Sequence, residues 1–150
     1  MKILIIDDEP ANVRMLEHLL RTRGYGRVLG LTDSRKALET CAAFDPDLIL
    51  LDLIMPDPDG FAILEALRSS DGPESFLPIV VLTADVTEEA KERALEVGAT
   101  DFLVKPVSRT EALLRIRNLL EARRVQVILE NQRSALEDAV RERTVELRGN

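Results

Sequence analysis

Acidic residues follow two apolar stretches of the sequence, and a threonine and a lysine follow two others. Asp7 and Asp8 come directly after ILII, Asp52 after LILL, Thr83 after IVVL and Lys105 after DFLV. Aspartates that converge at one place repel one another and raise their pKa values unless a cation joins them. A small set of hard oxygen ligands that leaves room for water suits Mg²⁺. The residue types therefore predict a magnesium site, provided that the fold brings these stretches together.

The stretch LILLDLIMPDPDG at residues 48–60 shows how such a site would be held. An apolar strand that ends on Asp52 places a charge where burial is costly, so the charge is either neutralised there or used. Two prolines and a glycine stiffen and turn the loop that follows. We interpret Asp57 and Asp59 as turn-forming residues rather than ligands.

Apolar runs typical of strands alternate with patterns typical of helices. We expect strands at residues 2–7, 27–32, 48–52, 78–84 and 101–106, and helices at 10–24, 33–43, 60–70, 87–98 and from near 108. Val13, Leu16 and Leu20 share one side of the first helix and should face the core. On the second helix we expect a buried cluster of four residues, Ala37, Leu38, Cys41 and Ala42.

Strand–helix alternation repeated five times indicates a parallel sheet with helices on both faces. The runs ILII, LILL and IVVL lack polar alternation, as expected of strands that are covered on both sides. We therefore predict a single doubly wound α/β domain over residues 1–121. In such sheets ligands bind beyond the carboxyl ends of the strands, which is where the aspartates, the threonine and the lysine fall.

The last helix continues far beyond this domain. Between residues 109 and 148 there is no proline or glycine, which predicts about 40 helical residues. Over residues 122–150 an imperfect heptad seam runs through seven positions, Ala122, Val125, Leu129, Gln132, Leu136, Ala139 and Arg143. We interpret this segment as a parallel two-stranded coiled coil that links two copies, because an isolated polar helix needs a partner to be stable. A frayed, solvated helix is the alternative.

Charge and cysteine content limit the partners and the compartment. The net charge is −7, and residues 1–121 hold 14 Lys or Arg against 22 Asp or Glu. This acidic balance argues against direct nucleic-acid binding, because phosphate neutralisation needs a basic face. The single cysteine, Cys41, excludes an intramolecular disulfide and fits a reducing compartment. The N-terminal apolar run is too short for a signal peptide or a membrane span, so we expect a cytoplasmic protein.

Four motifs at successive strand ends resemble the receiver domain of bacterial response regulators. They are IIDDEP, LLDLIMPDPDG, VLTA and FLVKP, and they occur in this order over residues 1–121. The resemblance implies the flavodoxin-like strand order 2-1-3-4-5. It also implies a sensor histidine kinase or a phosphotransfer protein as partner, with Asp52 as the residue that accepts the phosphoryl group.

The resemblance assigns the remaining site residues as well. It implies that Asp7, Asp8, Asp52 and the backbone carbonyl of Ile54 hold Mg²⁺, and that Lys105 pairs with the phosphoryl oxygens. These roles are physically sensible, since phosphoryl transfer depends on positioning and charge neutralisation. In the family the peptide bond that corresponds to Lys105–Pro106 is commonly cis.

Switching is implied in the same way. Thr83 would donate its hydroxyl to the phosphoryl group, and Phe102, at the place of the family's switch aromatic, would turn inward. Asp85 could orient or hinder hydrolytic water, but we favour a solvated residue that leads into the next helix. The resemblance implies no enzymatic activity beyond self-phosphorylation and self-dephosphorylation.

Three other functions compete with this interpretation. A flavodoxin-type cofactor binder would need a Ser/Thr/Gly-rich phosphate loop after the first strand, where this chain has acidic DDEP. An aspartyl phosphatase typically needs a second acid two positions after the nucleophile, and Ile54 occupies that position. A pseudo-receiver that acts only as an interaction or dimerisation module remains the alternative. The complete set of aspartates, threonine and lysine argues against it.

The C-terminal helix is similar to the linkers that precede output domains. Together with LIMPDPDGFAILEALR it resembles response regulators that carry HD-GYP cyclic di-GMP phosphodiesterase domains. Diguanylate cyclases and some kinases have comparable linkers. We therefore expect residues 122–150 to lead toward an output domain, with a cyclic di-GMP phosphodiesterase as one candidate among these. Of the remaining candidates, His18 is expected to be exposed and chemically idle, and Cys41 to be a small buried apolar residue.

Overall fold

Five parallel strands form the centre of the molecule. The computed structural model describes residues 1–56, 58–71 and 77–148. The strands are β1 (Lys2–Ile6), β2 (Arg27–Leu31), β3 (Leu48–Asp52), β4 (Ile79–Thr83) and β5 (Asp101–Val104), in the order β2-β1-β3-β4-β5. All four pairings are parallel, so the predicted doubly wound sheet and its strand order 2-1-3-4-5 are confirmed.

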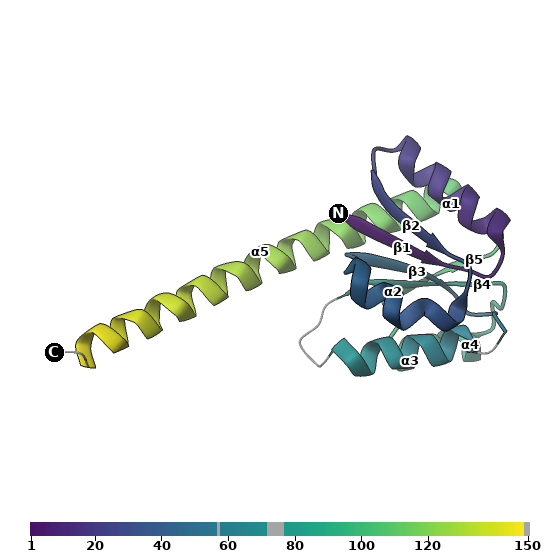
Figure 1. Cartoon of the computed structure of the whole chain (residues 1–150). Helices are drawn as coiled ribbons and strands as arrows, with labels where there is room; N and C mark the ends of the chain where they lie inside the picture. Colours follow the sequence, from purple (N-terminus) through teal and green to yellow (C-terminus); the bar gives the residue numbers. More distant parts are fainter. Residues whose placement is uncertain (57, 72–76, 149–150) are drawn as a thin grey trace.

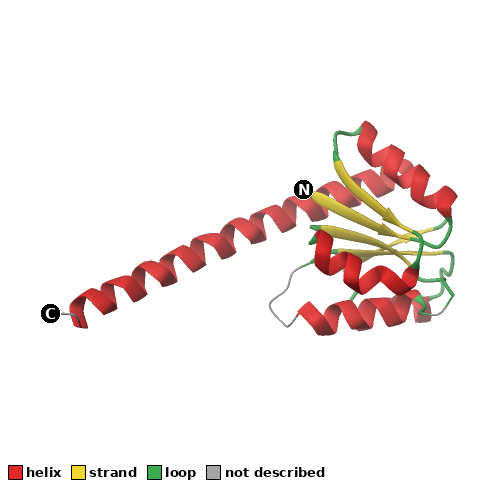
Figure 2. Cartoon of the chain, in the orientation of Figure 1, coloured by secondary structure: helices red, strands yellow, loops and turns green. Residues whose placement is uncertain are grey.

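Helices cover both faces of the sheet (Figures 1 and 2). They are α1 (Pro10–Thr22), α2 (Ala37–Phe44), α3 (Gly60–Asp71), α4 (Glu88–Val97) and α5 (Arg109–Arg148), with a short 3₁₀ helix, η1 (Ser34–Lys36), before α2. Leu4 and Ile6 of β1 point into a core shared with α2, α3 and α4. Ile3 and Ile5 point into a second core shared with α1 and α5. Alternate residues of one strand thus serve opposite faces, which explains the uninterrupted apolar runs.

Local signals in the sequence mark the starts of α1 and α4. Pro10 stands in the first turn of α1, where its missing N–H costs nothing. The Thr87 side chain accepts a hydrogen bond from the backbone N–H of Ala90 and caps α4. Val13, Leu16 and Leu20 of α1 are buried, as predicted.

The second helix differs from the prediction. Residues 34–36 form the 3₁₀ turn η1, capped by the Asp33 side chain, and only Ala37 to Phe44 are α-helical. Ala37 is buried, but Leu38 is 47% exposed and Ala42 is exposed as well. Cys41 is half-buried against the core. Ala37, Cys41 and Phe44 follow helical spacing on one face, so Leu38 and Ala42 fall beside that face and turn outward.

The long helix α5 belongs to the domain only along its first half. Leu120 is buried in the α1–α5 core, and Arg123 contacts Asp47 with 3.8 Å between Nε and Oδ1. From Ile128 to Arg143 every described side chain is exposed, and the helix projects from the domain (Figure 1). No helix among the described residues combines the length and the apolar character that crossing a bilayer requires.

Candidate functional site

Three aspartates meet at the carboxyl ends of β1 and β3. Asp7 follows the last residue of β1, and Asp52 is the last residue of β3. The two strands are neighbours in the sheet, with Ile6 paired to Leu51. Asp7 and Asp52 are 1% and 2% exposed, whereas Asp8 is exposed. One carboxylate oxygen from each of the three lies within 4.8 Å of the others, so the predicted convergence is present.

Backbone and side-chain donors hold the two buried carboxylates in place. Asp7 accepts hydrogen bonds from the backbone N–H of Glu9 at 3.0 Å and from the side-chain amide of Asn12 at 3.3 Å. Asp52 accepts one from the backbone N–H of Ile54 at 3.1 Å. Asn12 was missed by the sequence interpretation. The signal that could have found it is its position in the first turn of α1, which starts beside the end of β1.

Lys105 reaches the same cluster from the end of β5. Its Nζ lies 3.1 Å from Oδ1 of Asp52 and 3.6 Å from Oδ2 of Asp7. The backbone N–H of Lys105 donates to the carbonyl of Thr83 on the neighbouring strand. The Lys105–Pro106 peptide bond is cis, as the resemblance implied.

Charge at the cluster is not balanced by protein groups alone. Burial raises the pKa of Asp52 above its ordinary value, and the nearby charge of Asp7 raises it further, while the Ile54 N–H and the Lys105 ammonium act in the opposite direction. Two buried carboxylates therefore share one ammonium. A donor set of carboxylate oxygens with surplus negative charge fits a small divalent cation such as Mg²⁺.

Thr83 is the last residue of β4, the strand next to β3, and Phe102 lies on β5. Thr83 is 5% exposed, and its Oγ1 accepts a hydrogen bond from the backbone N–H of Asp85 at 3.0 Å. Phe102 is half-buried against the core, with the ammonium of Lys91 5.1 Å from its ring centroid. Asp85 is exposed and accepts from the backbone N–H of Thr87, which lowers its pKa. This arrangement matches the favoured interpretation of Asp85 as a residue that leads into α4.

The loop after β3 packs tightly beneath Asp52. Gly60 donates its N–H to the carbonyl of Leu53, and a Cβ at Gly60 would overlap the backbone of Asp52 and Leu53. Asp59 accepts from the backbone N–H of Ala62 and so caps α3, as its interpretation as a turn residue predicted. Asp57 lies outside the described residues.

Two further predictions concern Ile54 and His18. The Ile54 side chain is 66% exposed and its N–H is bonded to Asp52, while the metal contact of its carbonyl stays a prediction. His18 is exposed, as expected.

Beside the carboxylates, a cavity of about 160 Å³ is bordered by Met15, Pro106 and Val107 among others. Asp7 and Lys105 also border this cavity, so its wall includes part of the cluster.

The site combines residues from the carboxyl ends of four strands. Asp7 and Asp52, which are buried, follow β1 and end β3, Lys105 follows β5, and the buried Thr83 ends β4. The family model of the response regulator receiver domain matches residues 3–117. The chain belongs to this family. Receiver domains act in phosphorylation-based signalling of two-component systems, interact with histidine kinases and bind Mg²⁺ at an acidic pocket.

The curated relatives of this chain bear the names of different kinds of protein. The chain is 41% identical over 119 residues to a probable transcriptional regulator, ycf27, of Porphyridium aerugineum, covering 79% of this chain and 48% of that protein. It is 33% identical over 145 residues to a probable cyclic di-GMP phosphodiesterase of Vibrio cholerae, covering 97% of this chain and 32% of that protein. The chain thus spans about a third to a half of the length of these relatives.

Solved structures share the fold over the domain. The chemotaxis protein CheY4 of Vibrio cholerae aligns with a TM-score of 0.72 and 33% identity, covering 79% of this chain and 97% of that chain. The receiver domain of a histidine kinase from Syntrophus aciditrophicus aligns with a TM-score of 0.71 and 31% identity, covering 81% and 90%.

Proposed function

We propose that Asp52 accepts a phosphoryl group from a phosphohistidine of a sensor histidine kinase or a phosphotransfer protein. The observation that carries this proposal is the contact of buried Asp52 with Lys105 at 3.1 Å, next to buried Asp7. A carboxylate oxygen of Asp52 forms the new P–O bond as the P–N bond to histidine breaks. The electron pair of that bond returns to the imidazole nitrogen, and the product is an acyl phosphate.

The residues around Asp52 divide the work of positioning and charge neutralisation. The Lys105 ammonium, already within 3.1 Å of the carboxylate, pairs with the phosphoryl oxygens. Asp7, Asp8, Asp52 and the Ile54 carbonyl are the proposed Mg²⁺ ligands, and the carboxylate surplus supports this. When bound, Mg²⁺ neutralises charge on the carboxylates and on the transferred group. Thr83 donates its hydroxyl to a phosphoryl oxygen.

Phosphorylation is proposed to change the surface formed by α4, β5 and α5. The Thr83 hydroxyl now accepts from the backbone N–H of Asp85 at the start of the loop into α4. A hydroxyl drawn toward a phosphoryl group changes its position relative to that loop. Phe102, half-buried beside α4, then turns inward. Because packed cores rearrange between discrete states, a small shift is amplified.

The helix α5 is proposed to transmit this change to an output. Residues 1–121 form the receiver domain and residues 122–150 a linker that pairs with a second copy. The 33% identity over 145 residues to a probable cyclic di-GMP phosphodiesterase extends into this linker and supports an output of that class. We assign the chain itself no reaction beyond its own phosphorylation and dephosphorylation, no membrane insertion and no direct contact with nucleic acid. Its single cysteine supports a reducing compartment, the cytoplasm.

Intact-mass measurement after incubation with Mg²⁺ and acetyl phosphate tests the central step. We expect a gain of one phosphoryl group that requires Mg²⁺ and disappears in Asp52→Ala. The matched control is Asp59→Asn, which keeps an acceptor for the α3 cap in the same loop and should label normally. A protein that stays unlabelled under these conditions, while correctly folded, would be a pseudo-receiver that signals without phosphorylation.

A further inference from the structure

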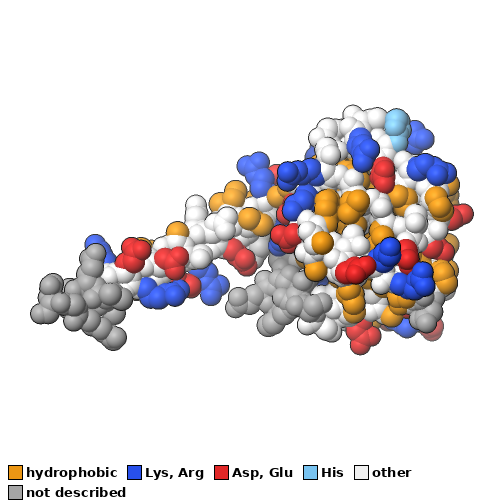
Figure 3. Space-filling view, viewed as in Figure 1, with side chains coloured by type: hydrophobic (Ala, Val, Ile, Leu, Met, Phe, Trp, Pro, Cys, Tyr) orange, Lys and Arg blue, Asp and Glu red, His pale blue; other side chains and the backbone are white. Residues whose placement is uncertain are grey.

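One side of the molecule carries a large share of its positive charge. Residues 10–31 and residues 109–124, which form α1, β2 and the first part of α5, hold nine arginines and three glutamates. The rest of the chain holds eleven Lys or Arg and twenty-four Asp or Glu. Figure 3 shows basic side chains gathered over α1 and the adjoining part of α5. The net charge of −7 therefore conceals a basic side on an otherwise acidic protein.

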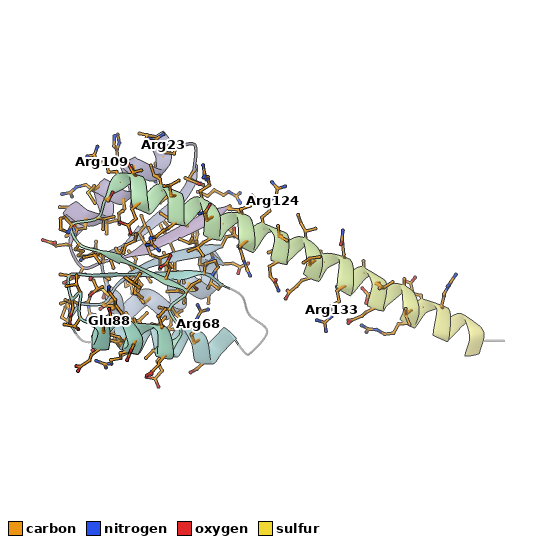
Figure 4. All side chains as sticks on the ribbon, turned by 180° about the vertical axis from the view of Figure 1, so that it is seen from behind. Arg23, Arg68, Glu88, Arg109, Arg124 and Arg133 are labelled. Carbon is orange, nitrogen blue, oxygen red and sulfur yellow. The ribbon has the colours of Figure 1, made fainter. Side chains whose placement is uncertain are left out.

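Most of these arginines are not neutralised by neighbours. Arg21, Arg115 and Arg123 pair with carboxylates. The other six are exposed and form no salt bridge with any carboxylate in the described part of the chain: Arg14, Arg23, Arg27, Arg109, Arg117 and Arg124. Seen from behind, Arg23, Arg109 and Arg124 lie along the same side of α1 and α5 (Figure 4). Unpaired charge of one sign attracts and steers a partner of the opposite sign.

A groove lies within this basic side, between the end of α1 and the first turns of α5. Its volume is about 350 Å³, and its walls are Arg23, Tyr25, Thr110, Leu113, Leu114 and Arg117. Tyr25 and Leu113 pack on the α1–α5 core, and Leu114 is 45% exposed. The groove thus combines an apolar floor with two exposed guanidinium groups. It shares no residue with the Asp7–Asp52–Lys105 site.

We propose that this groove binds an acidic, amphipathic segment of a protein partner. Apolar side chains of that segment would rest on Tyr25, Leu113 and Leu114, and its carboxylates would pair with Arg23 and Arg117. Tyrosine and arginine, together with tryptophan, are enriched among the residues that dominate binding energy at protein interfaces. The arginines outside the groove, such as Arg109 and Arg124, extend the same charge along α5 and favour a segment longer than the groove itself.

The apolar floor distinguishes this partner from nucleic acid. Proteins that bind single strands stack successive bases on several aromatic rings. Among the described residues that line the groove, Tyr25 alone is aromatic. Outside the basic side the molecule carries more acidic than basic residues, and this negative charge would repel a long polyanion. A short acidic segment with apolar anchors avoids that repulsion and fills the floor.

Fluorescence anisotropy on the full chain tests the proposal. The probe is a labelled helical peptide of glutamate and leucine with the leucines three and four positions apart, and the reference peptide has glutamine in place of glutamate. We expect the acidic peptide to bind and Arg23→Glu/Arg117→Glu to weaken it by about tenfold or more. Leu114→Asn should weaken it as well. The control is Arg14→Glu, which should change the affinity by less than about twofold. Arg14 is also exposed and forms no salt bridge in the described part of the chain, but it lies on α1 outside the groove.

Several outcomes would overturn the groove as the binding site. They are equal binding by the double variant, equal weakening by Arg14→Glu, absence of binding, and tighter binding of a short thymidine oligonucleotide in the same buffer. All substituted residues are exposed, so thermal melts should match the parent protein. Labelling of Asp52 by acetyl phosphate should be unchanged in these variants. Failure of the groove is therefore distinguishable from failure of the phosphoryl site.

Discussion

At the scale of single residues, the negative charge of Asp52 opposes folding when no cation is bound. Burial and the charge of Asp7 raise the pKa of the Asp52 carboxyl group, which means that its ionised form is less stable in the folded protein than in the unfolded chain. Protonated Asp52 therefore stabilises the folded protein at pH values below the pKa that this carboxyl group has in the unfolded chain. This stabilisation is lost as the pH rises through the higher pKa that the group has in the folded protein. The site keeps a carboxylate there at the expense of stability, which is typical of functional sites.

We therefore predict that Asp52→Asn raises the melting temperature of the metal-free protein by a few degrees at neutral pH. The amide keeps the shape and an acceptor for the Ile54 N–H, and it removes the buried charge. Thermal melts in EDTA at several pH values check this. The difference between variant and parent should widen as the pH rises from the ordinary pKa of an aspartate to the raised pKa of Asp52, and should level off above it. A variant less stable than the parent at neutral pH would contradict the assignment of net repulsion to this cluster.

Asp8 offers a way to separate metal binding from folding. It is exposed, whereas Asp7 and Asp52 are buried, so Asp8→Asn should leave the metal-free melting temperature nearly unchanged. The loss of one of three carboxylates should weaken Mg²⁺ binding by about tenfold. Because a ligand that binds only the folded state raises its stability, Mg²⁺ titrations followed by melting temperature measure this affinity. Glu9→Gln, an exposed neighbour outside the carboxylate cluster, is the control.

Residue types and their positions at strand ends were enough to predict which side chains of the site converge. Asp7, Asp8, Asp52, Thr83 and Lys105 each follow or end an apolar run, and parallel strands bring such positions to one edge. Asn12 could not be found in this way, because its role depends on the direction in which α1 leaves the sheet. Sequence patterns carry little information on such an angle.

At the scale of elements, the same limit explains the error in the second helix. The sequence predicted a helix over residues 33–43 but did not indicate whether its first turn would be 3₁₀ or α, and that choice rotates every following side chain. Leu38 consequently faces outward. The strands were predicted to within one or two residues at each end, because an uninterrupted apolar run leaves a covered strand no alternative face.

A side-chain strap joins α3 to the end of α4. Arg68 Nε donates to the carbonyl of Gly98 at 2.7 Å, and its Nη2 donates to Oγ1 of Thr100 at 3.2 Å. That hydroxyl oxygen in turn accepts from the backbone N–H of Ile79 at 3.0 Å. Gly98 has φ of 124°, and a Cβ there would collide with the Arg68 side chain. The strap therefore requires both the arginine and the glycine.

We predict that Arg68→Met lowers the free energy of unfolding by about 1–3 kcal/mol, because a half-buried carbonyl and a hydroxyl lose a charged donor. Urea denaturation measures the change. The control is Arg93→Met on α4, which should lower the free energy of unfolding by less. The Arg93 guanidinium stacks 3.9 Å from the Phe61 ring centroid and forms no hydrogen bond to α3 in the described contacts. An equal or smaller loss in Arg68→Met would show that the strap is not important for stability.

At the scale of the whole molecule, charge and shape are visible only once the fold is known. The total charge argued against any basic surface, yet the arginines of α1 and α5 gather on one side when the two helices pack together. The length of α5 was predictable from the absence of proline and glycine, and its 40 residues span about 60 Å. The sequence predicted that the helix leaves the domain after residue 121, and Leu120 is the last buried residue along the described part of α5.

The heptad seam of residues 122–143 lies on the side of α5 that faces away from the domain, which supports the pairing of two copies. At about 100° per residue, the positions that face the domain, Leu120, Arg123 and Val127, lie roughly opposite to Val125 and Leu129 of the heptad seam. Two chains could therefore pair along the seam without displacing either domain. Along the projecting part the exposed large apolar residues are Val125, Ile128, Leu129, Leu136 and Val140. A lone helix with such a surface would fray in water.

We predict that the chain is dimeric at micromolar concentration and that Leu129→Glu/Leu136→Glu makes it monomeric, because like charges would then meet at two positions of the seam. Light scattering after size exclusion measures the mass, and circular dichroism at 222 nm should fall as the freed helix frays. Glu130→Gln/Glu137→Gln, on exposed positions outside the seam, should keep the dimer. A parent chain that is monomeric and still fully helical over this segment would contradict the coiled coil and favour a solvated single helix. In that case α5 would transmit its signal without any change in helix pairing.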